Sequence, residues 1–254
     1  MSRAVKPAPA PNVVDFHARL APGLLTTMDA CGITRAAVSA GGLVDLDTLS
    51  DRLVEAHRGD EPADNAAVLR SAQASGGRLL PFFFADPRCD VEAYAKAAPD
   101  FRGLEISPAV HGVRLDDPGV TALVATAAEH HHPVYLVCLG RPGTRAADLV
   151  ALATAFPTVD FVFGHCGFTG LDARGLATIA PQPNIAAETS GCFTAVARLA
   201  LARLGPARVL FGTEYPLQDP RVELAKLAAL DLEPPVLRAM TSENALRLLG
   251  EENR

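Results

Sequence analysis

Short apolar runs alternate with amphipathic helical segments along almost the whole chain. The runs predict strands at Val13–His17, Ala36–Ala40, Leu79–Phe84, Gly103–Ser107, Val134–Leu139, Asp160–His165, Asn184–Ser190 and Val209–Glu214. Because they are apolar at nearly every position, they are typical of parallel strands buried on both faces. Ala-rich segments between them predict helices, among them Asp117–His131, Thr144–Phe156 and Phe193–Leu204.

Eight repeats of strand and helix predict one α/β fold, a (β/α)8 TIM barrel. An open doubly wound sheet is the alternative, but no Gly-x-Gly-x-x-Gly motif follows the first strand, which argues against a dinucleotide-binding version. The long connection after the second strand includes an acidic stretch, Val44–Asp64, which we expect to cover the barrel mouth as a lid. A helical tail, Arg221–Leu230 and then Pro235–Leu249, follows the last strand. We expect residues 12–254 to form one domain behind a Pro/Ala-rich tail at 1–11.

Composition and charge exclude several classes of function. The net charge is −6 and the basic residues are scattered, so the chain has no basic stripe for nucleic acid. No run approaches the roughly 18 apolar residues of a membrane span, and no signal peptide is visible, so we expect a cytoplasmic protein. The five cysteines are odd in number and widely spaced, which disfavours a disulfide framework. A small-molecule substrate is the expected partner, and a homodimer through the outer helices is possible.

Chemically active side chains collect at the predicted carboxyl ends of the strands, where TIM barrels carry their chemistry. Several such groups on one face favour a functional site over packing alone. They are His17, Arg19, Glu105, Ser107, Cys138, His165, Cys166, Glu188, Ser190 and Glu214. The tract His130–His132 lies at the other end of the barrel, where interaction with a helix dipole explains it better than metal binding.

Four motifs, in order and at fitting spacings, resemble the amidohydrolase-related family of the amidohydrolase superfamily. They are Val14-Asp15-Phe16-His17, Phe163-Gly164-His165-Cys166-Gly167, Leu210-Phe211-Gly212-Thr213-Glu214-Tyr215-Pro216 and Asn244-Ala245-Leu246-Arg247-Leu248-Leu249-Gly250. The resemblance implies a metal-dependent barrel that hydrolyses C–N or C–O bonds or decarboxylates small carboxylated substrates, usually around zinc or manganese.

The chain departs from the family pattern at three of its five metal positions. The pattern has His-x-His on the first strand, a His ending the fifth, a His ending the sixth and an Asp ending the eighth. This sequence keeps His17 and His165, but it has Arg19 for the second His, Cys138 on the fifth strand and Glu214 for the Asp.

These departures leave the role of each residue open. The candidate metal ligands are His17, Cys138, His165 and Glu214, because thiolate, imidazole and carboxylate all bind zinc. For Cys138, an inert buried thiol is as good an interpretation as a metal ligand, and a nucleophile activated by Arg19 or a histidine is a third one. Arg19 either holds a substrate carboxylate or phosphate with its planar fork or pairs with Glu214 in place of the metal charge.

Three hypotheses follow. The first is a hydrolase that acts on a small carboxylated substrate with Zn²⁺ or another divalent metal. The second is a metal-independent decarboxylase, lactonase or cyclase, in which His165 and Glu214 are the catalytic acid and base. The third is a non-catalytic relative that retains the pocket for binding. Expected substrate-binding residues are Arg19, Glu105 and His111, the last in the loop after the fourth strand.

Overall fold

The computed structural model contains a (β/α)8 barrel, as predicted, and describes residues 12–41, 45–55 and 63–251. Its eight strands run parallel and in chain order. They are β1 (Val13–Arg19), β2 (Ile33–Ser39), β3 (Leu79–Ala85), β4 (Gly103–Ile106), β5 (Val134–Leu136), β6 (Phe161–Phe163), β7 (Ile185–Glu188) and β8 (Val209–Leu210). The predicted tail at 1–11 lies outside the described residues.

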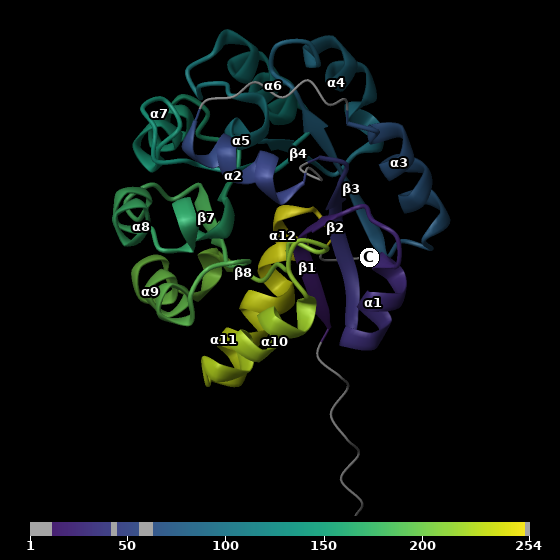
Figure 1. The fold of residues 1–254 in the computed structure, drawn as a ribbon, viewed down its shortest axis with the longest axis vertical. Coiled ribbons are helices and arrows are strands. Elements are labelled where there is room, and N and C mark those ends of the chain that lie inside the picture. The colour runs from purple at the N-terminus through teal and green to yellow at the C-terminus, as the bar shows by residue number, and fades with distance from the viewer. Residues whose placement is uncertain (1–11, 42–44, 56–62, 252–254) are drawn as a thin grey trace, which may run out of the picture.

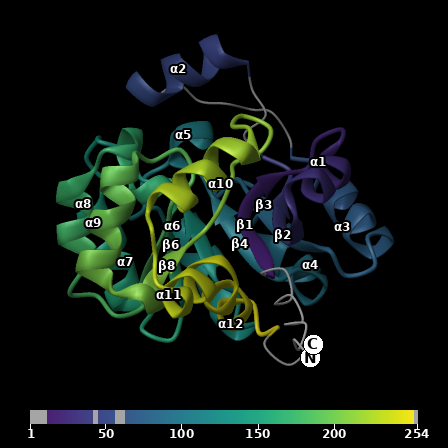
Figure 2. The same cartoon turned by 90° about the horizontal axis from the view of Figure 1, so that it is seen from below.

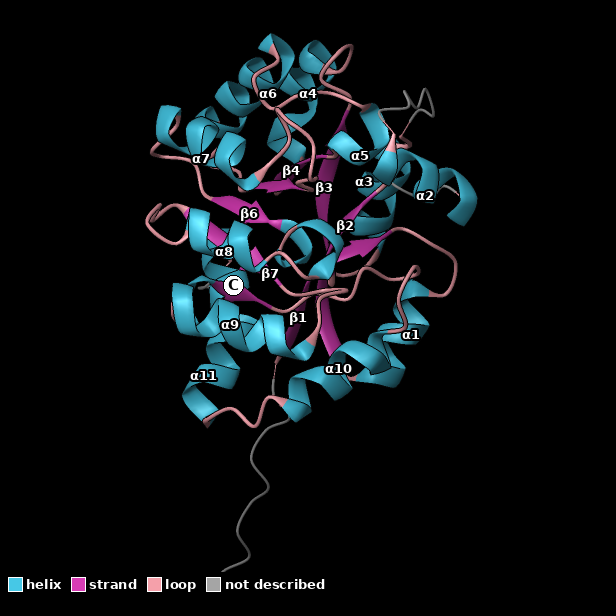
Figure 3. Ribbon diagram, turned by 60° about the vertical axis from the view of Figure 1, so that its left-hand side comes forward, coloured by secondary structure: helices cyan, strands magenta, loops and turns pink. Residues whose placement is uncertain are grey.

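Helices form a layer around the strands (Figures 1 and 3). They are α1 (Leu24–Cys31), α3 (Asn65–Ala74), α4 (Val91–Ala97), α5 (Pro108–His111), α6 (Pro118–Glu129), α7 (Ala146–Ala155), α8 (Ala173–Ile179), α9 (Thr194–Leu204), α10 (Pro220–Ala229), α11 (Pro234–Arg238) and α12 (Asn244–Leu248). A short π-helical turn, Ala239–Glu243, joins α11 to α12. No helix in the described part of the chain is long and apolar enough to cross a membrane.

The barrel closes between β8 and β1 through backbone hydrogen bonds. The amide of Phe16 donates to the carbonyl of Phe211 at 2.9 Å, and the amide of Glu214 donates to the carbonyl of His17 at 2.7 Å. The buried carboxylate of Asp15 reinforces this seam, because it accepts hydrogen bonds from the amide of His17 at 3.0 Å and from the amide of Thr213 at 2.9 Å. His17 and Glu214, on opposite sides of the seam, are thereby held together.

Two apolar layers fix the direction of the side chains. The interior of the barrel contains Val14, Phe16, Ala37, Leu80, Phe82, Tyr135, Val162, Ala186 and Leu210, and residues of α12 pack against them. A second, larger cluster lies between strands and helices, and Cys138 belongs to it. β5 therefore directs Tyr135 into the barrel, and Cys138, beyond the end of the strand, packs in the outer layer.

An additional helix, α2 (Leu46–Val54), interrupts the long connection after β2. It stands over the same end of the barrel as α5, whereas α12 lies at the opposite end (Figure 2). Arg141 holds it there by donating a hydrogen bond to the carbonyl of Arg52 at 3.1 Å. The predicted lid is thus a helix over the mouth, although part of the stretch Val44–Asp64 lies outside the described residues.

Candidate active site

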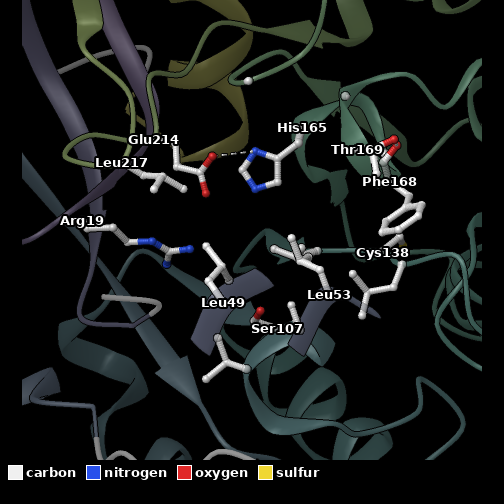
Figure 4. A pocket seen from close by; sticks show the side chains of 17 residues that line it. Arg19, Leu49, Leu53, Ser107, Cys138, His165, Phe168, Thr169, Glu214 and Leu217 are labelled. Carbon is white, nitrogen blue, oxygen red and sulfur yellow. Dashed lines mark hydrogen bonds and ion pairs between the residues drawn. The ribbon is translucent and has the colours of Figure 1, made fainter. Parts of the chain in front are cut away.

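A cavity of about 220 Å³ opens at the carboxyl ends of the strands, beneath α2 (Figure 4). Its walls are mostly apolar, with Leu49 and Leu53 from α2 and Phe168 from the loop after β6. Arg19 projects into it from one side, and His165 and Glu214 face it from another (Figure 4). The site is therefore a small apolar chamber with a cation and two proton-accepting groups at its edge.

Arg19 is anchored at one nitrogen and free at the other two. Nη1 donates to Oε1 of Glu105 at 2.5 Å and to Oγ of Ser39 at 2.7 Å. Among the described residues, Nε and Nη2 have no hydrogen-bond partner, and these two nitrogens form the fork that matches a carboxylate. The centroid of the Phe84 ring lies 5.6 Å from the guanidinium carbon, within the range of a cation–π interaction.

Glu105 supports Arg19 rather than lining the cavity. Its Oε1 also lies 3.4 Å from Nε2 of His17, and its Oε2 accepts a hydrogen bond from Ser39 at 2.6 Å. Burial acts to raise the pKa of Glu105, but the charge of Arg19 and the hydrogen bonds from His17 and Ser39 outweigh it and hold that pKa well below its usual range. The ionised carboxylate has its partners within the protein, so direct substrate binding by Glu105 stays a prediction without a contact to support it.

His17 presents a buried lone pair. Because ionised Glu105 can only accept, Nε2 of His17 carries the proton, and Nδ1 is buried without a hydrogen-bond partner among the described residues. Burial and then the charge of Arg19 lower the pKa of His17, which keeps the ring neutral. The ring stacks on Tyr135, with centroids 4.1 Å apart. A neutral imidazole with a free nitrogen is a metal ligand or a proton acceptor.

His165 and Glu214 occupy turns that ordinary strand geometry does not produce. Their φ angles are +57° and +55°, in the left-handed region that non-glycine residues rarely adopt. Nδ1 of His165 lies 3.4 Å from Oε2 of Glu214 and 2.9 Å from Oγ of Ser190. Such strained positions are concentrated at functional sites.

The structure brings three of the four predicted metal ligands together. One ligand atom each from His17, His165 and Glu214 lies within 4.8 Å of the other two. Two imidazole nitrogens and a carboxylate fit zinc or manganese, and the unpartnered Nδ1 of His17 supports that fit. Cys138 lines the cavity but lies outside this group. Burial raises the pKa of its thiol, which opposes metal binding and nucleophilic attack.

His111, the other predicted substrate-binding residue, lies away from the cavity. It is buried, and its ring centroid lies 5.0 Å from that of Phe84. Its pKa is lowered, first by burial. The structure therefore places His111 behind Phe84, and a contact with substrate stays a prediction.

Sequence reasoning did not identify Tyr135 as a site residue. Its hydroxyl lies 3.5 Å from Nε2 of His165 and donates to Oε2 of Glu188 at 2.8 Å. Alternation along the fifth strand is the signal that could have revealed it, because Tyr135 has the parity of Val137, which packs against the barrel interior. Cys138 has the opposite parity.

The family model for Amidohydrolase matches residues 14–250, which is nearly the whole chain. The chain belongs to this family. It is an enzyme of the amidohydrolase superfamily, as the sequence motifs predicted. No curated protein gives a significant sequence match.

Solved structures share the barrel. An uncharacterised TIM-barrel protein from Bordetella bronchiseptica has a TM-score of 0.75 at 17% identity, with 96% of this chain and 100% of that chain covered. A putative 2-pyrone-4,6-dicarboxylic acid hydrolase from Pseudomonas putida has a TM-score of 0.69 at 17% identity, covering 96% and 100%. The 5-carboxyvanillate decarboxylase of Novosphingobium aromaticivorans, with bound manganese, has a TM-score of 0.67 at 18% identity, covering 91% and 81%. At these identities the likeness establishes the fold alone.

Proposed function

We propose that this enzyme hydrolyses a cyclic ester or amide that carries a carboxylate on a small flat ring. The observation behind the proposal is that Arg19 and the His165–Glu214 pair face one apolar cavity from different sides (Figure 4). A substrate carboxylate on the Arg19 fork would leave the ring between Leu49, Leu53 and Phe168. The reacting carbonyl would then lie toward His165.

The groups at the cavity favour water activation. His165 and Glu214 are in contact, so a proton removed from water by one can be shared with the other. Hydrolysis begins with removal of a proton from water, which requires a base. Both groups offer acceptor atoms, and the apolar walls strengthen their interaction with a bound water.

A divalent metal fits this proposal. His17, His165 and Glu214 would hold it, and when bound it would lower the pKa of a bound water and polarise the substrate carbonyl. The manganese bound to the decarboxylase from Novosphingobium aromaticivorans supports a divalent metal in this fold. Arg19 binds the substrate carboxylate, and Glu105 and Ser39 orient its guanidinium.

The test combines metal analysis with a substrate panel. Purified protein should contain about one equivalent of zinc or manganese by mass spectrometry. His17→Ala and Glu214→Ala should lose it, whereas Cys138→Ala, the matched control on the cavity wall, should retain it. Equal metal content in all four proteins would contradict the proposed ligands.

Carboxylated 2-pyrones and γ-lactones are the first substrates to assay, the pyrones by loss of ring absorbance and the lactones by release of acid. Arg19→Lys keeps the charge but lacks the fork, so we expect KM to rise roughly tenfold with kcat less affected. An unchanged KM would contradict the role of Arg19.

Decarboxylation of a hydroxylated aromatic acid is the second candidate. The 2,6-dihydroxybenzoate decarboxylase of Rhizobium supports it, since it shares the barrel with a TM-score of 0.69 at 16% identity. The same cavity would hold such an acid, but the ring carbon must receive a proton, which requires an acid at the cavity edge. Release of CO₂ without lactone hydrolysis would favour this candidate.

A further inference from the structure

A buried carboxylate on β7 collects hydrogen bonds behind His165. Glu188 is 0% exposed and accepts from the hydroxyl of Tyr135 at 2.8 Å, the hydroxyl of Ser190 at 2.9 Å and the amide of His165 at 3.3 Å. The amide of Ser190 also donates to it. These four donors occupy both oxygens of the carboxyl group, so Glu188 acts only as an acceptor.

Each hydroxyl group beside His165 has a single proton, which fixes the direction of the hydrogen bonds around the ring. Ser190 has one, which it donates to Glu188, so its oxygen accepts the contact from Nδ1 of His165 at 2.9 Å. Oε2 of Glu214, 3.4 Å from the same nitrogen, is a second acceptor. Both neighbours require a proton on Nδ1.

Among the residues that the structure describes, no donor remains for the other ring nitrogen of His165. The hydroxyl of Tyr135 lies 3.5 Å from Nε2, but its one proton goes to Glu188 at 2.8 Å. Nε2 thus keeps its lone pair. The ring edge away from Glu214 faces the open cavity (Figure 4).

We propose that Glu188 and Ser190 are positioning residues that hold His165 in its Nδ1–H tautomer, so that Nε2 offers a lone pair to the cavity. The inference rests on the proposed function insofar as that lone pair serves as base or ligand there. A mutation that inverted the tautomer would turn the same nitrogen into a donor.

Two glycines leave the space that the side chains of this network occupy. A Cβ on Gly212 would lie 2.3 Å from Oε1 of Glu188, and a Cβ on Gly164 would lie 2.6 Å from the hydroxyl of Tyr135. From outside, α10 braces the loop that carries Ser190. Oε1 of Glu223 accepts from the amide of Gly191 at 3.1 Å, and Lys226 donates to the carbonyl of Thr189 at 2.6 Å.

The test measures the tautomer directly, by ¹⁵N NMR of ring-labelled histidine in the chelator-treated full-length protein. Wild type should show the Nδ1–H pattern for His165, assigned by its loss in His165→Gln. Glu188→Gln replaces one acceptor oxygen by an amide NH₂ group, which donates. The Ser190 hydroxyl should then turn its proton toward Nδ1 of His165, and the population of the Nε2–H tautomer should rise. Ser190→Ala should shift the population the same way, and Ser190→Thr should restore it.

Tyr135→Phe is the matched control, because it removes a donor to Glu188 without touching Nδ1. We expect it to keep the Nδ1–H pattern. The network-breaking variants should also lose roughly 10–100-fold in turnover. The inference would be overturned if His165 of the wild-type protein showed the Nε2–H pattern. It would also be overturned if both Glu188→Gln and Ser190→Ala kept the Nδ1–H pattern. A tautomer that shifts as expected in an enzyme inactive on every lactone and aromatic acid would reject the proposed function alone.

Discussion

Replacing Glu105 by Gln should destabilise the protein strongly, because it leaves the Arg19 guanidinium buried without its countercharge. The two side chains are 1% and 5% exposed, and the contact between Nη1 and Oε1 is 2.5 Å. Gln keeps the shape but removes the charge. Removal of one partner from a buried ion pair costs about 3–5 kcal/mol. For a chain of this size that corresponds to a fall of roughly 6–20 °C in the melting temperature.

Differential scanning calorimetry at pH 7 measures this effect, with two comparison variants. Asp116→Asn removes one partner of the exposed Arg114–Asp116 pair, whose contact is 2.7 Å, and should leave the melting temperature unchanged. The double variant Arg19→Met/Glu105→Gln removes both buried charges and should recover part of the loss. If Glu105→Gln had the same melting temperature as Asp116→Asn and wild type, the buried pair would not be stabilising and the reasoning would fail.

The same pair has a pH signature. Because the folded pKa of Glu105 is depressed below its ordinary value of 4.5, its stabilisation is complete above that value. It is lost as the pH falls through the depressed folded pKa. The advantage of wild type over Glu105→Gln should therefore narrow only in acid. A constant difference from pH 7 down to the acid transition would contradict an ionised Glu105.

Three further perturbations probe the lid, the network and the far end of the barrel. Leu49→Ala should weaken benzoate binding about three- to tenfold by calorimetric titration, whereas Leu46→Ala on the exposed side of α2 should not; equal effects would argue against α2 as a cavity wall. Gly212→Ala should cost about 1–3 kcal/mol in urea unfolding, because the new methyl overlaps the Glu188 carboxylate, and a neutral result would mean that Glu188 can move freely. Burial lowers the pKa of His132 to about 4, so as the pH falls the unfolded chain takes up this proton before the folded protein does, which destabilises the fold. His132→Asn should therefore lose less stability than wild type between about pH 6.5 and 4. An unchanged pH profile would show that His132 does not titrate in this way.

The repeating apolar runs were sufficient to predict all eight strands and the order of the barrel, because parallel strands buried on both faces leave a strong local pattern. Their ends were predicted too long. The last strand was expected to reach Glu214 but ends at Leu210, and the sixth was expected to reach His165 but ends at Phe163. The backbone has positive φ at His165 and at Glu214, the two predicted strand ends, and sequence pattern does not report such turns.

The hydrogen-bond partners within the site could not be predicted from the sequence, for a different reason. Its network joins residues far apart along the chain, such as Tyr135 with Glu188 and Arg19 with Glu105, and only their position in the barrel makes them neighbours. The interpretation of His132 was wrong on similar grounds. It is buried and its Nδ1 lies 2.8 Å from the hydroxyl of Tyr94, so it is a neutral core residue and no cation for a helix dipole.

The charges of the site favour one of the two roles considered for Arg19. If Arg19 replaced a missing metal, its charge would be directed at Glu214. Its hydrogen-bonded ion pair is instead with Glu105, which leaves Glu188 and Glu214 without a full countercharge from Arg19. Burial of uncompensated carboxylates is costly. A divalent cation beside His17 and His165 would offset that excess, while Arg19 still lines the cavity. The arginine is thus better explained as a substrate anchor added beside a metal position than as a substitute for the metal.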